Sequence, residues 1–251
     1  MTQKNIDEAK KDKRVTYHYL LNNINMFNAM PSDNPSKIII YCHGLGANRC
    51  WATRYYQKLL EKNIGIISFD LPGHGRDKTP FNKFTIDLCL SYLEQVISYA
   101  KNTYHSKIYL LGSSYGGFVL LNRLMTQNKD IEKTYLISPA INFCEIIERR
   151  AGIELNEYLK TNDHIHIFYD IDIYKEAYQK MKKQEQQIKN YNFKNIYIIH
   201  GQKDRTVLLK DVNTFSTNNN LKLKVVEEGK HELHGHEEEI VNFILKILNI
   251  L

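Results

Sequence analysis

The sequence predicts an α/β fold with a mostly parallel central sheet flanked by helices. From residue 37 onward, short apolar runs rich in β-branched residues alternate with longer segments whose apolar residues recur at helical spacing. The runs are typical of buried strands and the segments of amphipathic helices. Their alternation indicates βα units in a sheet covered on both faces. A length of 251 residues accommodates one large domain of this class, and we expect a single domain over residues 1–251.

The elements follow in order along the chain. Two apolar stretches within 14–30, on either side of Asn22-Asn23, predict an opening β-hairpin. Further strands are expected at 38–42, 64–70, 108–111, 134–138, 195–199 and 223–228. Helices are expected at about 51–62, 84–101, 117–125 and 237–251.

Residues 142–192 interrupt this alternation. The stretch is rich in charge, Tyr and Gln, too short for a domain and too long for a simple connection. We expect a short helical cap over the carboxyl edge of the sheet. Five apolar or aromatic side chains of the cap are candidates for lining an acyl or aryl pocket: Phe143, Ile146, Tyr158, Phe168 and Tyr169. The alternative for each of them is ordinary packing of the cap onto the body. Its acidic cluster either binds a substrate amine or simply faces solvent; the members are Glu145, Glu148, Glu154 and Glu157.

Composition excludes several classes of protein. The formal net charge is +6, from 34 Lys and Arg against 28 Asp and Glu, and the basic residues are spread along the chain rather than interleaved with aromatics. We therefore expect no nucleic-acid partner. No apolar run approaches the roughly 20 residues of a membrane-spanning helix. The charged N-terminus lacks the apolar core of a secretory signal, so a cytoplasmic location is expected, and the four cysteines, which form no CxxC pair, are expected to be free thiols.

The most informative motif is GSSYGG at 112–117, between an expected strand and an expected helix. It contains G-x-S-x-G with Ser114 at its centre. In this context a sharp strand-to-helix turn lifts the serine hydroxyl above the sheet, and small residues two before and two after it let the chains pass. The helix N-terminus directs backbone N–H groups at developing negative charge. The alternative is a glycine-rich turn with an incidental serine.

The turn HGLG at 43–46 follows the expected strand 38–42. Such a loop can direct one backbone N–H at the same point above the sheet. We expect the N–H groups of Leu45 and Tyr115 to form a two-donor oxyanion hole, with both side chains in the pocket wall. The alternative, a phosphate-binding loop, lacks the third glycine of a dinucleotide fingerprint. A second tight turn at 69–75 carries His74, which we expect to be structural.

Candidates for an acid and a base follow the last two strands. Asp204, just past 195–199, can accept a hydrogen bond from histidine Nδ1, with Asp211 as its nearest rival and helix capping as the alternative role. Of the three histidines after the final strand, His231 comes first past Gly229 and is the expected base. His234 and His236 are expected to be structural or exposed. The spacing H-x-x-H-x-H allows a metal site but lacks the HExxH pattern, so no metal is expected.

Taken together, HGLG, DLPGHG, GSSYGG, HGQKD and GKHELHG resemble, in order and spacing, the α/β-hydrolase superfamily. More narrowly they resemble small bacterial carboxylesterases and serine-aminopeptidase-like or monoacylglycerol-lipase-like members with a short cap. The resemblance runs from about residue 35 to the C-terminus and is weakest over 142–192. It implies the α/β-hydrolase fold, with Ser114 as nucleophile, Asp204 as acid, His231 as base, and Leu45 and Tyr115 as oxyanion donors.

These residues lead us to expect a serine hydrolase that cleaves a carboxylic ester through an acyl-enzyme. The expected partner is a small-molecule acyl ester, and no cofactor is required. A thioesterase or a serine aminopeptidase would use the same triad and is the alternative among enzymes. Outside enzymes, the alternative is a non-catalytic binding module on the same fold.

Overall fold

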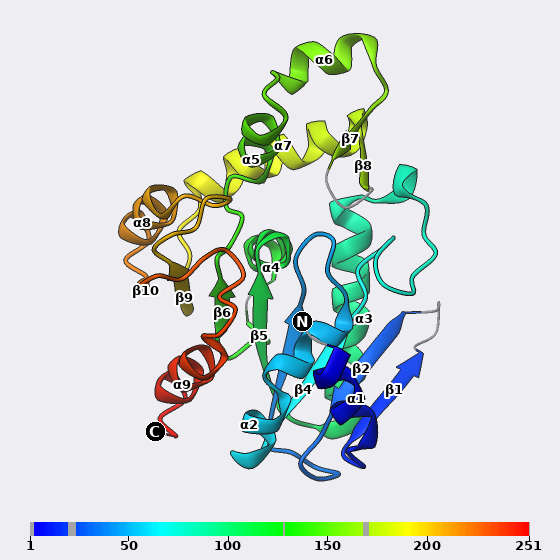
Figure 1. Cartoon of the computed structure of the whole chain (residues 1–251), viewed down its shortest axis with the longest axis vertical. Helices are drawn as coiled ribbons and strands as arrows, with labels where there is room; N and C mark the ends of the chain where they lie inside the picture. Colours follow the sequence, from blue (N-terminus) through cyan, green and yellow to red (C-terminus); the bar gives the residue numbers. More distant parts are fainter. Residues whose placement is uncertain (1–2, 20–23, 128, 168–170, 251) are drawn as a thin grey trace.

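The computed structural model describes residues 3–19, 24–127, 129–167 and 171–250. Within them, an eight-stranded sheet runs through the centre of the molecule (Figure 1). In the order in which they pair, its strands are β1 (Val15–Tyr19), β2 (Asn25–Ala29), β4 (Ile64–Phe69), β3 (Lys37–Cys42), β5 (Lys107–Ser113), β6 (Thr134–Ile137), β9 (Ile196–Gly201) and β10 (Lys222–Val226).

Strand direction agrees with the predicted class. β1 and β2 form the expected antiparallel hairpin, and β2 also pairs antiparallel with β4. All pairs from β4 to β10 are parallel, which confirms the mostly parallel sheet. The predicted turn at Asn22-Asn23 lies outside the described residues.

Helices cover both faces of the sheet because its strands bury side chains on both sides. Along β3, Ile38, Ile40 and Cys42 belong to one core cluster, while Ile39 and Tyr41 belong to the other. This alternation is the period-two geometry of a strand. The first face packs against α3 (Ile86–Tyr104), α4 (Tyr115–Thr126) and α8 (Leu209–Asn218). The second packs against α1 (Gln3–Lys11), the 3-10 helix η1 (Arg49–Arg54), α2 (Tyr56–Glu61) and α9 (Glu237–Ile247).

The segment 142–192 gathers above the carboxyl ends of the parallel strands (Figure 1). It contains α5 (Phe143–Ala151), α6 (Leu155–Thr161), β7 (His164–Ile167), β8 (Ile171–Tyr174) and α7 (Lys175–Asn190). The antiparallel pair β7–β8 was not expected in a helical cap. Its alternating pattern, with Ile165, Ile167, Ile171 and Ile173 buried while His166 is exposed and Asp172 half-buried, is the signal of a half-buried strand.

Other differences from the expected elements are local. The helix expected at 51–62 is divided into η1 and α2, and α1 and the short 3-10 helix η2 (Phe81–Lys83) were not expected. All four cysteines are free thiols. No helix in the described part of the chain combines the length and the apolar character needed to cross a bilayer.

Candidate active site

Ser114 stands at a sharp turn between β5, which ends at Ser113, and α4, which begins at Tyr115. Its φ of 51° lies in the left-handed region, where a non-glycine residue is strained. The turn is fixed from several sides: Ser114 N–H donates to the Ile137 carbonyl at 3.0 Å, and Ala140 N–H donates to the Ser114 carbonyl at 3.0 Å. A Cβ on Gly112 would stand 2.8 Å from the Gly116 carbonyl oxygen, so this position requires glycine.

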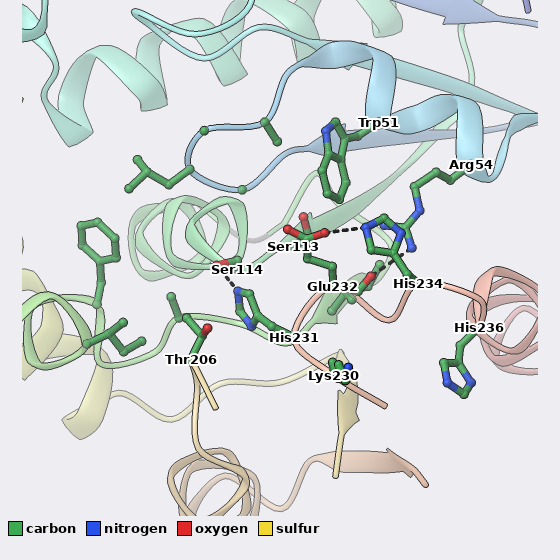
Figure 2. Close-up of a pocket in the computed structure, with 18 of the residues that line it drawn as sticks. Trp51, Arg54, Ser113, Ser114, Thr206, Lys230, His231, Glu232, His234 and His236 are labelled. Carbon is green, nitrogen blue, oxygen red and sulfur yellow. Dashed lines mark hydrogen bonds and ion pairs between the residues drawn. The ribbon is translucent and has the colours of Figure 1, made fainter. Parts of the chain in front are cut away.

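The structure joins Ser114, His231 and Asp204 by hydrogen bonds. His231 Nε2 lies 2.9 Å from Ser114 Oγ (Figure 2), and His231 Nδ1 lies 2.7 Å from Asp204 Oδ2. An ionised carboxylate only accepts hydrogen bonds, so Nδ1 carries the proton in this pair. Nε2 of the neutral ring is then the acceptor for the serine hydroxyl. This arrangement can move a proton from Ser114 onto a ring whose other nitrogen faces a carboxylate.

Asp204 is buried and held by its own loop. Its Oδ1 accepts hydrogen bonds from Thr206 N–H at 2.8 Å and Val207 N–H at 2.9 Å, which leaves Oδ2 for His231. The carboxylate therefore caps a turn and orients the histidine at once. The rival Asp211 lies in the first turn of α8, where its Oδ2 accepts from Asn142 Nδ2 at 3.0 Å.

The two other histidines of this loop have other partners. His234 Nε2 lies 2.5 Å from Glu232 Oε2, and its ring centroid is 5.7 Å from that of Trp51. His236 Nδ1 lies 3.3 Å from Glu239 Oε2, at the start of α9. Both line the same cavity as Ser114, but their ring nitrogens contact glutamates instead of the serine. Figure 2 shows His234 beside Glu232.

The loop 43–47 passes directly over the serine. A Cβ on Gly44 would be 3.2 Å from Ser114 Cβ, which places the following residue, Leu45, at the cavity. The expectation that both oxyanion candidates have side chains in the pocket wall is half wrong. Leu45 lines the cavity, whereas the Tyr115 ring is fully buried and packs against Phe143, with ring centroids 4.6 Å apart.

A buried histidine fixes this loop from below. His43 Nδ1–H donates to the Gly44 carbonyl at 2.8 Å, and His43 Nε2 accepts from Leu71 N–H at 3.0 Å. Burial lowers the pKa of His43 to about 3, so the ring stays neutral and its acceptor nitrogen remains available. His74, whose ring lies 5.4 Å from that of His43, donates from Nδ1 to the Pro72 carbonyl at 2.8 Å within its own turn.

A cavity of about 700 Å³ opens beside Ser114 and His231. Of the expected pocket residues, Phe143 and Ile146 line it, and Phe168 and Tyr169 lie outside the described residues. Tyr158 is a correction: it does not belong to the lining that the described residues form. It is 38% exposed on α6, because Leu155 and Leu159 are the residues that this helix buries.

The acidic cluster of the cap is engaged elsewhere. Glu145 pairs with Lys189, Glu148 pairs with Lys182, and Glu157 pairs with Lys160. Glu154 accepts from the first N–H groups of α6. None of these four carboxylates is among the described residues that line the cavity, so they do not form an amine-binding site beside Ser114.

Sequence reasoning missed several residues that line this cavity, among them Trp51, Arg54 and Ser113. Ser113 Oγ lies 2.9 Å from the hydroxyl of the buried Tyr41. The spacing of Trp51 and Arg54 along the chain gives no local signal of this position, because their neighbours in the cavity come from the loop 231–236. No group of three His, Cys, Asp or Glu side chains suited to a metal ion is present in the described part of the chain.

Comparison with known proteins agrees with this architecture. Residues 39–179, more than half of the chain, match the sequence profile of the alpha/beta hydrolase family. Protein phosphatase methylesterase 1 of Candida albicans is 30% identical over 131 residues, which are 50% of this chain and 33% of that protein. A putative alpha/beta hydrolase of Acanthamoeba polyphaga mimivirus is 29% identical over 125 residues, which are 47% of this chain and 46% of that protein. The matched segment thus spans less than half of either relative.

Solved structures share the fold over nearly the whole chain. Est1E from Butyrivibrio proteoclasticus, in a structure with bound ferulic acid, is 21% identical with a TM-score of 0.78, over 93% of this chain and 99% of that one. A monoacylglycerol lipase of Paleococcus ferrophilus is 15% identical with a TM-score of 0.66, over 89% of this chain and 98% of that one. The sequence profile and the mostly parallel sheet lead to one assignment: the chain belongs to the alpha/beta hydrolase family.

Proposed function

We propose that this hydrolase cleaves a carboxylic ester of a small molecule through an acyl-enzyme, with Ser114 as nucleophile, His231 as general base and Asp204 as the acid. One observation carries the proposal: a continuous hydrogen-bonded chain runs from Asp204 through His231 to a serine strained at a strand-to-helix turn, and it opens into a cavity. Hydrogen bonding between nucleophile, base and orienting carboxylate is the signature of an activated serine.

In the first half-reaction, Ser114 Oγ attacks the ester carbonyl carbon while His231 Nε2 takes the hydroxyl proton. The carbonyl oxygen becomes an oxyanion, and in this proposal the backbone N–H groups of Leu45 and Tyr115 donate hydrogen bonds to it. His231 then gives its proton to the departing alcohol oxygen. In the second half-reaction, water loses a proton to His231 and attacks the acyl-enzyme, and the acid leaves as Ser114 regains its proton. Losing one oxyanion donor typically costs about 2.7–4 kcal/mol of transition-state stabilisation.

The cavity offers an apolar side for the acyl or aryl group. Leu45, Phe143 and Ile146 line this side, and Phe143 is held rigidly by its packing against Tyr115 and Phe118. A buried apolar wall of this kind binds a hydrocarbon chain or ring by removing it from water. Relatives named as a methylesterase and a monoacylglycerol lipase are consistent with an ester as the scissile bond.

The test is a panel of substrates with Ser114→Ala as the matched variant. We expect hydrolysis of p-nitrophenyl esters with a dependence on acyl length, and little turnover of an acyl-CoA or an aminoacyl-naphthylamide. Ser114→Ala should lower kcat by about 10⁴-fold or more, since the nucleophile carries most of the triad's contribution. Its thermal unfolding should match that of the wild-type protein.

A fluorophosphonate probe gives an independent readout, because it reacts with an activated serine without needing the correct substrate. Peptide mapping should find one label, on Ser114. A label on Ser113 instead would contradict the assignment of the nucleophile. Faster turnover of the acyl-CoA or the aminoacyl-naphthylamide than of any ester would replace the esterase with the thioesterase or the aminopeptidase, and an unlabelled, inactive protein would favour a binding module.

A further inference from the structure

The 3-10 helix η1 stands between the two loops that the proposed reaction uses. It follows the loop 43–47 directly, and its first residue is anchored in the core. Arg49 N–H donates to Asp70 Oδ1 at 2.8 Å, and the Arg49 guanidinium pairs with the other oxygen of the same buried carboxylate. The start of η1 is thereby fixed against the turn after β4. The backbone of η1 is therefore held in place for the side chain at its other end.

The side chain of Arg54, the last residue of η1, extends to the loop that carries His231. Its Nη2 donates to the carbonyls of Glu232 at 3.0 Å and Leu233 at 3.2 Å. Nη2 and Nε also bind Glu237 Oε1, at 2.7 and 3.0 Å. The Arg54 side chain is only 3% exposed, and its guanidinium carbon lies 5.2 Å from the ring centroid of Trp51 and 5.4 Å from that of Tyr55. Its planar donors are thus directed at fixed acceptors rather than at solvent.

The loop that carries His231 needs such a tether. Leu233 has a φ of 47° and Glu228 a φ of 57°, a conformation that non-glycine residues avoid. Residues in such conformations persist only where their surroundings over-determine them. On the side before His231, Lys203 N–H donates to the Gly229 carbonyl at 2.8 Å. On the side after it, Arg54 binds the two carbonyls that follow. His231 therefore lies between two fixed points, one from the loop after β9 and one from η1.

We propose that Arg54 is a positioning residue: by binding the carbonyls of Glu232 and Leu233, it holds His231 in register with Ser114 and with the loop that carries Leu45. This role rests on the proposed function, because Arg54 positions His231, the general base of that reaction. Arg54 acts through the backbone of the loop and not on the substrate. Its removal should therefore impair the chemical step and leave substrate affinity nearly unchanged.

The experiment compares Arg54→Met, which keeps the length of the side chain, with Arg54→Lys, which keeps the charge but offers a single ammonium. The matched control is Lys58→Met. Lys58 pairs with Glu238 at 2.9 Å, so it joins α2 to α9 nearby, but both side chains are exposed, at 43% and 73%. Kinetics on the preferred p-nitrophenyl ester are combined with hydrogen exchange of the backbone amides of 229–236, which requires no activity.

A misplacement of about 1 Å can cost about 10²-fold in rate. We expect Arg54→Met to lower kcat by about that factor with KM within about threefold, and Arg54→Lys to recover about tenfold of the loss. The amides of 229–236 should exchange faster in Arg54→Met at a temperature where the protein remains folded. Lys58→Met should match the wild type in kcat and in exchange.

Two results would overturn the proposal. If both Arg54 variants have wild-type kcat and wild-type amide exchange, Arg54 does not hold the loop in place. A raised KM with unchanged kcat would make Arg54 a substrate-binding residue instead. Failure of the proposed function is recognisable separately. In that case the wild-type protein neither hydrolyses esters nor reacts with the fluorophosphonate, and hydrogen exchange alone still decides whether Arg54 holds the loop.

Discussion

At the scale of single residues, the histidine segment separates three chemically identical side chains by their partners. His231 faces Asp204 at one ring nitrogen and Ser114 at the other. His234 and His236 instead face Glu232 and Glu239. Gly229 is where the loop returns across the sheet edge, and it approaches Gly201 so closely that a Cβ on Gly201 would meet the Gly229 carbonyl. Two residues later the chain stands above Ser114.

Replacing each histidine by alanine tests this difference. His231→Ala should lower kcat by about 10⁴-fold or more, because no other residue in the described part of the chain is hydrogen-bonded to Ser114 Oγ. His236→Ala should keep kcat within about threefold. His234→Ala removes a ring from the cavity wall, so KM should change while kcat stays within about tenfold. Steady-state kinetics on one ester decide the matter, and an inactive His234→Ala beside an active His231→Ala would reassign the base.

At the scale of elements, the strands of the sheet were predictable because each consists of a short run of apolar residues that is visible in the sequence. β3 and β4 lie within a residue or two of their predicted bounds. Elements defined by distant partners were not predictable. η1 buries two arginines, Arg49 and Arg54, which an amphipathic sequence pattern does not predict. Each is paired with a carboxylate from a distant part of the chain: Asp70 is 21 residues after Arg49, and Glu237 is 183 residues after Arg54. α1 buries only Ala9, so its periodicity carries no signal.

The site follows the same division. Its nucleophile, acid and base candidates stand at strand ends that local patterns reveal, so the sequence could name Ser114, Asp204 and His231 as candidates and the structure brings them together. The wall made by Trp51 and Ser113 could not be named, because which loops face each other depends on the order of strands in the sheet. Tyr158 shows the same limit, since an aromatic residue in a cap segment faces the cavity only if its helix does.

The turn between β5 and α4 makes a prediction at this scale. A Cβ on Gly116 would collide with the Cys42 carbonyl at the end of β3. Gly116→Ala should therefore push α4 away from β3, destabilise the protein by about 1–3 kcal/mol as overpacked cores do, and lower kcat by about 10²-fold through misplacement of Ser114. Urea unfolding and ester kinetics measure the two effects.

Gly152→Ala is the matched control. Gly152 ends α5 at a φ of 67°, and a Cβ there would meet nothing within 4 Å. This variant carries local backbone strain without a collision, so it should lose some stability and keep wild-type kcat. Unchanged kcat in Gly116→Ala would show that the close approach of α4 and β3 does not position Ser114.

At the scale of the whole molecule, the carboxyl edge of the sheet collects buried imidazoles as well as the candidate triad. His43 follows β3, His74 lies in the turn after β4, and His200 lies in β9, where it donates to the Val207 carbonyl at 3.1 Å. Burial lowers the pKa of all three, and that of His43 to about 3. Burial raises the pKa of the Asp70 and Glu185 carboxyls. As pH falls, these carboxyls favour the folded state, whereas the buried histidines favour the unfolded state.

These pKa values make stability depend on pH in a definite direction. Between about pH 3 and the unperturbed histidine value of 6.5, the unfolded chain binds a proton at His43 that the folded protein does not. Stability contributed by the neutral ring is therefore present above pH 6.5 and lost as pH falls. The free energy of unfolding should drop between pH 7.5 and pH 5.0 by about 2 kcal/mol from His43 alone, at 1.36 kcal/mol for each pKa unit. Urea unfolding at the two pH values measures the drop.

His43→Gln separates this contribution from the rest. A glutamine keeps a donor for the Gly44 carbonyl and an acceptor for Leu71 N–H but does not titrate, so the variant should be less stable at pH 7.5 and lose about 2 kcal/mol less than the wild type on acidification. Equal pH dependence in wild type and His43→Gln would mean that His43 is not the group that couples acid to unfolding. The neutral ring would then hold the loop 43–47 without making it sensitive to pH.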